Sequence, residues 1–184
     1  LGAWMLLPGA APAAGEPAGG AGVAVREAAG LYTITARFEV PQGPAVALAV
    51  LTDYEQIPRF MPDVRRSLVL ERAPGRVVVE QEAIARMMMF SRRIHLRLEV
   101  EEDAHGLRFR DASGTSFTHY EGRWCVAALG SGTAITYELT ARPGFDVPGF
   151  LLSRLLKRDA VQMIQRLRVE VARRDGSRTR PAGH

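Results

Sequence analysis

The chain contains a single cysteine, Cys125, and only four histidines among its 184 residues. One cysteine excludes an intramolecular disulfide and any metal site built from several thiolates. The histidines stand at positions 95, 105, 119 and 184, and this spacing does not bring them to a common face for metal binding. We therefore predict neither a metal nor a cofactor.

Sequence motifs of common enzyme classes are also scarce. No glycine-rich phosphate-binding loop is present, and neither Ser113 nor Ser116 lies in the elbow motif of a nucleophilic serine. The apolar run at residues 1–7 is well short of the ~20 residues that span a bilayer, so it is not a membrane anchor by itself. The composition is that of an ordinary globular protein, with 47% hydrophobic and 24% charged residues, and the length suits one domain.

The charge is mildly basic, with a formal net charge of +4 and a sequence pI of about 9.8. Nucleic-acid-binding proteins usually concentrate such charge in one stripe. Here arginine is spread along the chain and gathers only in the last predicted helix and the tail. We interpret these charges as a solvated face, with an anionic membrane surface as the alternative, and we expect no nucleic-acid partner.

Residues 1–22 differ in composition from everything that follows. The apolar run is succeeded by proline, glycine and alanine, and residues 11–13 offer a small-residue cleavage site. We interpret the segment as a signal-peptide remnant, with a disordered leader as the alternative. The first interpretation predicts export to the periplasm or the exterior, and the second leaves a cytoplasmic location open.

Apolar and polar residues alternate in the segments that follow, a pattern typical of half-buried strands. The first such strand is predicted at 32–40, and Pro44 then permits a helix at 45–51, with a second short helix at 57–60. Turn signals separate six further predicted strands, at 64–72, 76–85, 88–102, 107–112, 118–129 and 133–142. Their short connections require antiparallel pairing, because a parallel pair needs a long crossover.

The last predicted element is a long helix. After Pro-Gly pairs at 143–144 and 148–149, apolar residues recur in steps of three and four from Phe150 to Val171. A helix of roughly 25 residues is ~37 Å long and can cover one face of a curved sheet. We expect the folded domain at 30–174 and a polar, disordered tail at 175–184.

An inward apolar sheet face under one helix forms either a solid core or a core with a cavity for a guest. We predict a cavity, whose mouth lies between the turn at 54–62 and the loop at 142–149. Flexible methionine side chains suit such a variable volume. The candidate ligand-binding residues are apolar or aromatic: Tyr32, Phe38, Tyr54, Phe60, Met61, Met88, Phe90, Tyr120, Trp124, Tyr137, Phe145, Leu152 and Leu156.

Two residues are candidates for a catalytic base, Glu82 and His119. A carboxylate that points into an apolar cavity can work as a general acid or base, which is the role considered for Glu82. His119 and Glu121 stand two residues apart on one strand face, within reach of an acid/base pair. Arg123 shares that face, so cross-strand charge pairing on a wet surface is the competing interpretation.

Three segments resemble the START-like (SRPBCC) superfamily, in its polyketide cyclase/dehydrase and coenzyme-Q-binding branch. They are 51–63 with the following strand, 117–126 and 132–139, and the first contains Asp-Tyr-x-x-x-Pro-x-Phe-x-Pro from Asp53 to Pro62. The resemblance covers roughly 30–173. It implies an α+β helix-grip fold, in which a curved antiparallel sheet, two short helices and a long C-terminal helix enclose an apolar cavity.

The superfamily includes lipid and quinone carriers, aromatase/cyclases, hormone receptors and ribosome binders, so the fold does not select the function. We expect a protein that binds or transports a lipophilic small molecule, such as a lipid, a quinone or a polyketide-like compound. The alternative is a cyclase or dehydratase acting on a polyketide-like substrate in the same cavity. A third interpretation is an interaction domain with a solid core. The sequence leaves the ligand's identity and the oligomeric state open.

Overall fold

Eight antiparallel strands form one sheet, in the order β1-β2-β8-β7-β6-β5-β4-β3. The computed structural model describes residues 22–87 and 90–178. The elements in chain order are β1 Gly22–Ala28, β2 Leu31–Val40, α1 Pro44–Leu51, the 3-10 turn η1 Tyr54–Gln56, α2 Ile57–Phe60, β3 Val64–Ala73, β4 Arg76–Met87, β5 Phe90–Asp103, β6 Gly106–Asp111, β7 Phe117–Leu129, β8 Gly132–Pro143 and α3 Gly149–Arg178. This architecture confirms the predicted α+β helix-grip fold.

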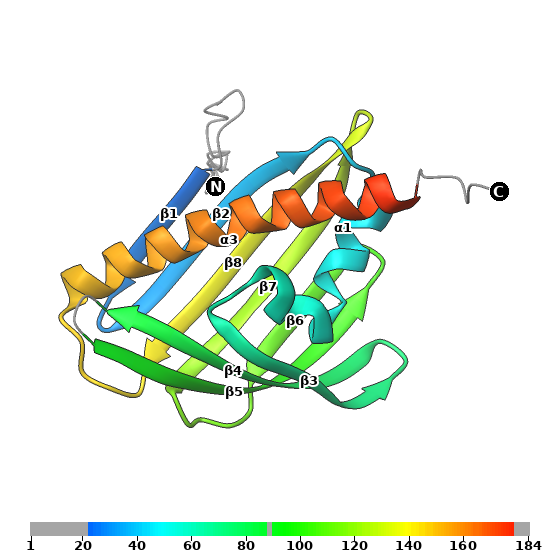
Figure 1. Ribbon diagram of the computed structural model, residues 1–184. Helices are drawn as coiled ribbons and strands as arrows, with labels where there is room; N and C mark the ends of the chain where they lie inside the picture. The colour runs from blue at the N-terminus through cyan, green and yellow to red at the C-terminus, as the bar shows by residue number, and fades with distance from the viewer. Residues whose placement is uncertain (1–21, 88–89, 179–184) are drawn as a thin grey trace, which may run out of the picture.

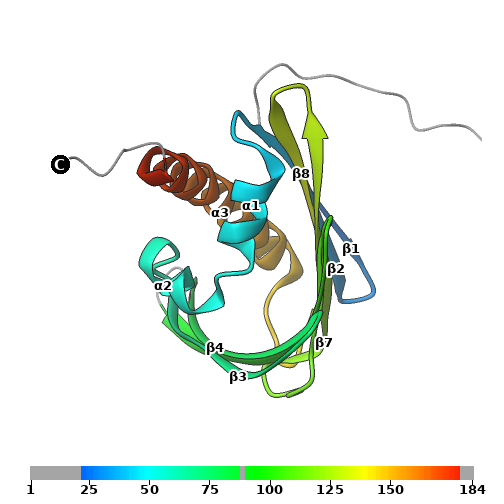
Figure 2. The ribbon, with the colours of Figure 1, turned by 90° about the vertical axis from the view of Figure 1, so that its right-hand side faces the viewer.

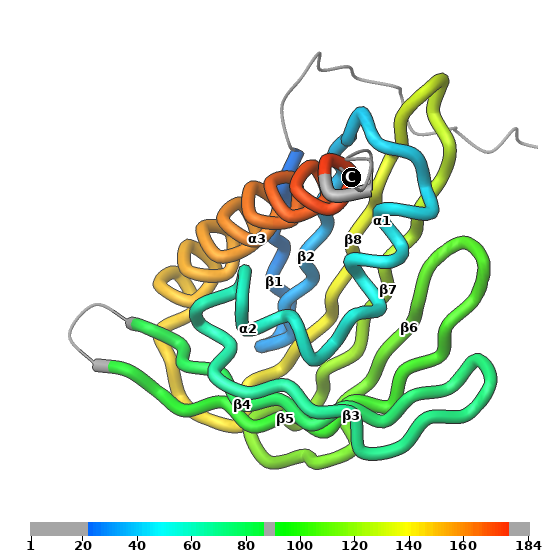
Figure 3. Tube along the Cα trace, turned by 45° about the vertical axis from the view of Figure 1, so that its right-hand side comes forward, coloured from blue at the N-terminus to red at the C-terminus, as the bar shows by residue number. Residues whose placement is uncertain are grey.

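The sheet bends strongly and wraps around the helices on its concave side. Helix α3 lies across β1, β2 and β8 (Figure 1), whereas β3 and β4 curve beneath α2 at the other end (Figure 2). In Figure 3 the chain from α1 through α2 runs between α3 and the β3–β4 end of the sheet. The concave side is therefore enclosed by helices and by the sheet's own curvature.

Strand β1 is an element that the sequence interpretation lacks, and it adds a strand to the sheet ahead of residue 30, the predicted start of the folded domain. It pairs with β2 through a two-residue turn, Ala29 and Gly30, whose φ angles are +50° and +75°. Two consecutive positive φ angles suit a tight hairpin turn, because they match the twist of the two strands. Alanine is unusual at a positive φ angle, so the sequence does not indicate this turn. The rest of the predicted leader lies outside the described residues.

The buried side chains form two clusters. One packs the apolar stripe of α3 against β2 and β8, with Phe38 and Ile135 nearly inaccessible and Ile164 at 0% exposure. The other covers β4, β5 and β6 and includes Tyr54 from the turn after α1. Each cluster fills one end of the concave side of the sheet. A space is left between the two clusters.

Helix α3 is 30 residues long and continues to Arg178. Residues 175–178, predicted as part of a disordered tail, are therefore helical, and 179–184 lie outside the described residues. Among the described residues, no helix combines the length and apolar composition needed to cross a bilayer.

An ion network fixes the C-terminal end of α3 to α1. Buried Glu170 accepts hydrogen bonds from Arg173 and Arg174, with distances of 2.7 to 2.8 Å. Arg174 also donates to Asp53 at 2.8 Å and to the Ala49 carbonyl at 3.2 Å. The bonds from Arg173 outweigh the opposing effect of burial and, with those from Arg174, lower the pKa of Glu170 to about 2.

Candidate ligand-binding cavity

A cavity of about 590 Å³ lies between the two buried clusters. This volume falls in the usual range for small-molecule sites. Its interior is formed by apolar and aromatic side chains from α1, the η1–α2 turn, the concave sheet face and α3: Val50, Leu51, Tyr54, Ile57, Phe60, Met61, Val64, Ile84, Leu98, Val100, Leu107, Phe109, Tyr120, Trp124, Tyr137, Met163 and Leu167. Gln81 is a polar residue of the same wall, and charged residues contribute where the cavity meets α3.

An aromatic wall on β6, β7 and β8 makes up one side. The Trp124 and Tyr137 rings pack with centroids 4.3 Å apart, and Phe109 lies 6.0 Å from Tyr120. Gly122 separates Tyr120 from Trp124 on the inward face of β7, and the Phe109 ring occupies the place that a side chain there would take. Alternation along β7 therefore presents two large rings to the cavity with a gap for a third.

Two hydroxyl groups in this wall have no partner within the described part of the chain, those of Tyr120 and Tyr137. Burial, with a smaller effect of Asp111, raises the pKa of Tyr120 to about 12. Burial and the neighbouring Tyr120 raise the pKa of Tyr137 well above 10. Both side chains are therefore neutral at ordinary pH, and each brings an O–H donor to the residues that line the cavity.

Tyr54 lines the cavity with its ring but uses its hydroxyl elsewhere. The hydroxyl donates to Glu102 Oε1 at 2.6 Å, and Arg72 lies 3.9 Å from the same carboxylate. Burial and this hydrogen bond raise the pKa of Tyr54. Tyr54 therefore holds the η1 turn against β5 and forms a fixed part of the wall.

Charged side chains from three distant segments meet at the cavity's rim. They are Asp63 before β3, Arg86 at the end of β4, and Arg158, Asp159 and Arg166 on α3. Asp63 lies 3.2 Å from Arg86 and 3.5 Å from Arg166. No local pattern announces this group, because its members are brought together only by the packing of α3 over the β3–β4 end of the sheet.

The structure places six of the predicted ligand-binding residues in the lining. They are Tyr54, Phe60, Met61, Tyr120, Trp124 and Tyr137. The lining residues that the sequence interpretation lacks are mainly aliphatic side chains of β5, β6 and α1, and the charged rim. The alternation along β5 predicts that Leu98 and Val100 face inward, whereas no sequence pattern predicts the charged rim.

The other predicted residues lie elsewhere. Tyr32 and Phe38 are buried in the core beneath α3, and Leu152 and Leu156 pack against that same core. Phe145 packs against Phe117 and beneath the Arg92 guanidinium, 4.0 Å from its ring centroid. The lining includes residues of the turn at 54–62 but none of the loop at 142–149, and the position of the mouth stays a prediction. Met88 and the side chain of Phe90 lie outside the described residues.

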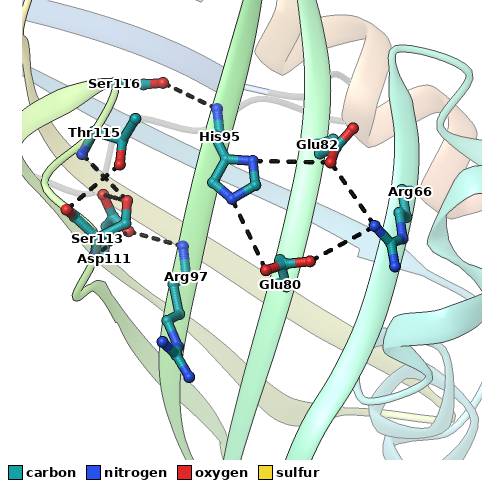
Figure 4. A network of polar contacts seen from close by, with 9 residues as sticks. All are labelled: Arg66, Glu80, Glu82, His95, Arg97, Asp111, Ser113, Thr115 and Ser116. Atoms are coloured by element: carbon teal, nitrogen blue, oxygen red, sulfur yellow. Dashed lines mark hydrogen bonds and ion pairs between the residues drawn. The ribbon is translucent and has the colours of Figure 1, made fainter.

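Neither candidate base faces the cavity. Glu82 belongs to a cluster on the outer sheet face with Glu80, Arg66 and His95 (Figure 4), where His95 Nδ1 lies 4.0 Å from Glu82. Glu82 points outward because its neighbour Gln81 points inward. His119 pairs with Glu121 at 3.5 Å, also away from the lining. Both residues thus take part in polar contacts on the outer face of the sheet. Among the described residues, no group of three or more potential metal ligands is present.

Solved structures with a similar fold include carriers and enzymes. A STAR-related lipid transfer protein from Xanthomonas axonopodis is 18% identical, with a TM-score of 0.68 over 86% of this chain and 97% of that one. A START superfamily protein from Mycobacterium smegmatis is 19% identical, with a TM-score of 0.66 over 77% and 97%. Zhui aromatase/cyclase from Streptomyces sp. R1128 is 16% identical, with a TM-score of 0.67 over 83% and 98%. At these identities the likeness shows the fold alone.

A family model described as polyketide cyclase / dehydrase and lipid transport matches residues 40–168. No curated protein matches this chain. The match spans most of the sheet and two thirds of α3, and it does not single out the coenzyme-Q-binding branch. The chain therefore belongs to the polyketide cyclase/dehydrase and lipid-transport family of START-like proteins.

Proposed function

We propose that this protein binds and carries a lipophilic small molecule in the cavity between the curved sheet and α3. The observation that carries the proposal is the cavity of about 590 Å³, with its apolar and aromatic interior. Burial of apolar ligand surface contributes roughly 25 cal/mol per Å², from which the cost of ordering the ligand is subtracted. The free hydroxyls of Tyr120 and Tyr137 favour a ligand that carries an oxygen acceptor, such as a quinone or a polyketide-like compound.

Filling the cavity tests this proposal. Met163 lines the cavity, whereas Gln165 is exposed on the other side of α3. We expect Met163→Trp to weaken binding of the neutral fluorophore N-phenyl-1-naphthylamine by about tenfold or more, since the indole occupies the ligand's volume. The control Gln165→Trp should bind the fluorophore like the parent protein.

Two measurements complete that test. Thermal unfolding of both variants establishes that each is folded under the conditions of the binding assay. Native mass spectrometry with lipid extraction of the parent protein should reveal a stoichiometric apolar guest. Equal binding by Met163→Trp and the parent, or no binding by the parent, would contradict the proposal.

A cyclase or dehydratase acting in the same cavity is the second candidate function. It is favoured by the phenols of the partly buried Tyr120 and the buried Tyr137, which can donate a proton or a hydrogen bond to a polyketide-like carbonyl. Glu82 and His119 lie outside the cavity, so these phenols replace them as candidates. Under this alternative, Tyr137→Phe abolishes turnover but leaves ligand retention intact, and mass spectrometry of the recovered compound shows an altered product.

We also propose that ligand exchange takes place at an anionic membrane surface. The first turn of α3 presents Phe150 with 81% of its surface exposed. Arg154 and Lys157 follow at spacings of four and seven residues, so they stand on the same side of the helix, and both are exposed. An exposed aromatic ring among cations suits a surface of acidic lipid headgroups.

A further inference from the structure

The charged rim of the cavity consists of Asp63, Arg86, Arg158, Asp159 and Arg166. Arg158 is already occupied: its Nε and Nη2 donate to Asp159 Oδ1 at 3.0 and 2.9 Å. Its Nη2 also lies 3.4 Å from the backbone carbonyl of Arg86. Asp63 is consequently the carboxylate that faces the two remaining guanidinium groups.

One carboxylate between two guanidinium groups leaves a positive charge in excess. Arg86 Nη1 approaches Asp63 Oδ1 at 3.2 Å, and Arg166 Nη1 approaches Oδ2 at 3.5 Å. In the described part of the chain, each arginine uses one nitrogen in this contact. Because a guanidinium group carries five N–H donors, both retain donors for a second anion. Arg166 is only 33% exposed, so part of its charge is removed from water.

The rim stands at the boundary of an otherwise apolar cavity. On α3, Arg166 is followed one residue later by Leu167, which lines the interior, and Met163 lines it one turn earlier. A ligand with its apolar part against these side chains would place a polar end beside Arg86 and Arg166. Guanidinium groups match the planar or tetrahedral oxygens of carboxylates and phosphates better than an ammonium group does.

We propose that Arg86 and Arg166 bind the anionic head, a carboxylate or a phosphate, of an amphiphile whose apolar part fills the cavity. The inference rests on the proposed carrier function and adds the class of its ligand. Asp63 holds the two arginines in place in the empty protein and competes with the ligand's anion. Replacing Asp63 by a neutral residue should therefore strengthen the binding of acids, whereas replacing the arginines should weaken it.

Competition against bound N-phenyl-1-naphthylamine tests the inference, with three competitors that share one alkyl chain: dodecanoate, dodecyl phosphate and dodecanol. The variants are Arg86→Gln/Arg166→Gln, Asp63→Asn, and Arg59→Gln as a control at an exposed arginine of α2 away from the rim. We expect the double variant to weaken dodecanoate binding about tenfold or more, because the carboxylate loses both of its guanidinium partners. Dodecanol and the fluorophore should be unaffected, and the control should match the parent.

The outcomes separate the inference from the function on which it rests. Tighter dodecanoate binding by Asp63→Asn, and loss of acid binding as salt rises, support the anion site. The ratio of dodecanoate to dodecyl phosphate affinity identifies the preferred head. If acid and alcohol compete equally and no variant changes their ratio, the anion site is wrong while the carrier stands. If the fluorophore itself does not bind the parent, the carrier function fails and this inference fails with it.

Discussion

At the scale of single residues, Tyr137 has the feature that points most directly to a ligand. The residue is 6% exposed and its ring packs against Trp124, yet its hydroxyl has no hydrogen-bond partner within the described residues. A ligand acceptor in the cavity could therefore use this O–H group. Tyr54 shows the contrasting arrangement, because its hydroxyl is bonded to Glu102 at 2.6 Å. Two tyrosines of one cavity thus have different roles.

This contrast predicts opposite effects for the same substitution. Tyr137→Phe should leave the free energy of unfolding unchanged or slightly increased, and should weaken binding of the quinone menadione by roughly three- to tenfold through loss of one hydrogen bond. Tyr54→Phe should lower the free energy of unfolding by roughly 1–2 kcal/mol, because Glu102 loses its buried donor.

Urea unfolding and menadione titration measure the two effects, with N-phenyl-1-naphthylamine as a ligand that lacks a carbonyl. Equal menadione affinity for Tyr137→Phe and the parent would show that the hydroxyl does not contact the ligand.

At the scale of elements, the C-terminal end of α3 depends on one buried carboxylate. The pKa of Glu170 is about 2 in the folded protein against an ordinary value of 4.5. A lowered folded-state pKa means that Glu170 stabilises the fold above pH 4.5, and that this stabilisation is lost as pH falls towards 2. The difference corresponds to roughly 3 kcal/mol at most.

Glu170→Gln should therefore destabilise the protein by roughly 1–3 kcal/mol at pH 7, because Arg173 and Arg174 lose the Glu170 carboxylate while Arg174 keeps its contact with Asp53. The difference from the parent should shrink steadily between pH 4.5 and pH 2. Urea unfolding across this range measures it, with Glu55→Gln as the control at an exposed carboxylate of η1. A difference that does not change with pH would assign the effect to packing.

The strands are the elements that can be predicted best from the sequence. The strand predicted at 64–72 is Val64–Ala73 in the structure, and that at 76–85 is Arg76–Met87. Each of these strands has one solvent-facing side and one side turned to the interior. Apolar and polar residues therefore alternate along the strand, and this alternation can be recognised in a short stretch of sequence. Strand β1 has no fully buried residue and ends in an unusual turn, so its signal is weak.

The cavity could be predicted only in part. The alternation of residues along a strand shows which side chains face inward, but it does not show which of them a helix covers. This alternation places Tyr120, Trp124 and Tyr137 on the inward face, and all three line the cavity. Tyr32 and Phe38 obey the same rule but lie beneath α3. Where a helix crosses a sheet depends on distant packing, and no local pattern encodes it. For the same reason the rim of Asp63, Arg86 and Arg166 could not be predicted from sequence.

At the scale of the whole molecule, two large apolar side chains of α3 are exposed among the described residues, one in the first turn and one in the C-terminal half of the helix. Phe150 is 81% exposed and Val169 is 70% exposed. Phe150 is accompanied by Arg154 and Lys157, whereas Val169 neighbours the Glu170 network. The membrane proposal concerns the first group only, and the second provides a matched comparison on the same helix.

We expect Phe150→Ser to reduce binding to vesicles of phosphatidylcholine and phosphatidylserine about fivefold or more, since burial of one aromatic side chain contributes roughly 1.5–3 kcal/mol. Val169→Ser should bind like the parent. Vesicle co-sedimentation at low and high salt measures both, and raised salt should release the parent protein. Salt-insensitive binding, or an equal loss in both variants, would remove the membrane proposal.

The hydrogen bonds from Arg174 to Asp53 and to the Ala49 carbonyl anchor the C-terminal end of α3. Phe150 lies 24 residues from Arg174, which is roughly 36 Å along the helix, so a tilt of about 10° about that end would move Phe150 by roughly 6 Å. Residues close to the pivot hardly move, whereas Phe150 travels farthest and Arg158 and Arg166 move by intermediate amounts. If α3 tilts about that end, Arg158 and Arg166 would shift relative to Asp63 and Arg86 while the exposed ring of Phe150 moves farthest, so we expect the width of the rim and the position of this ring to change together.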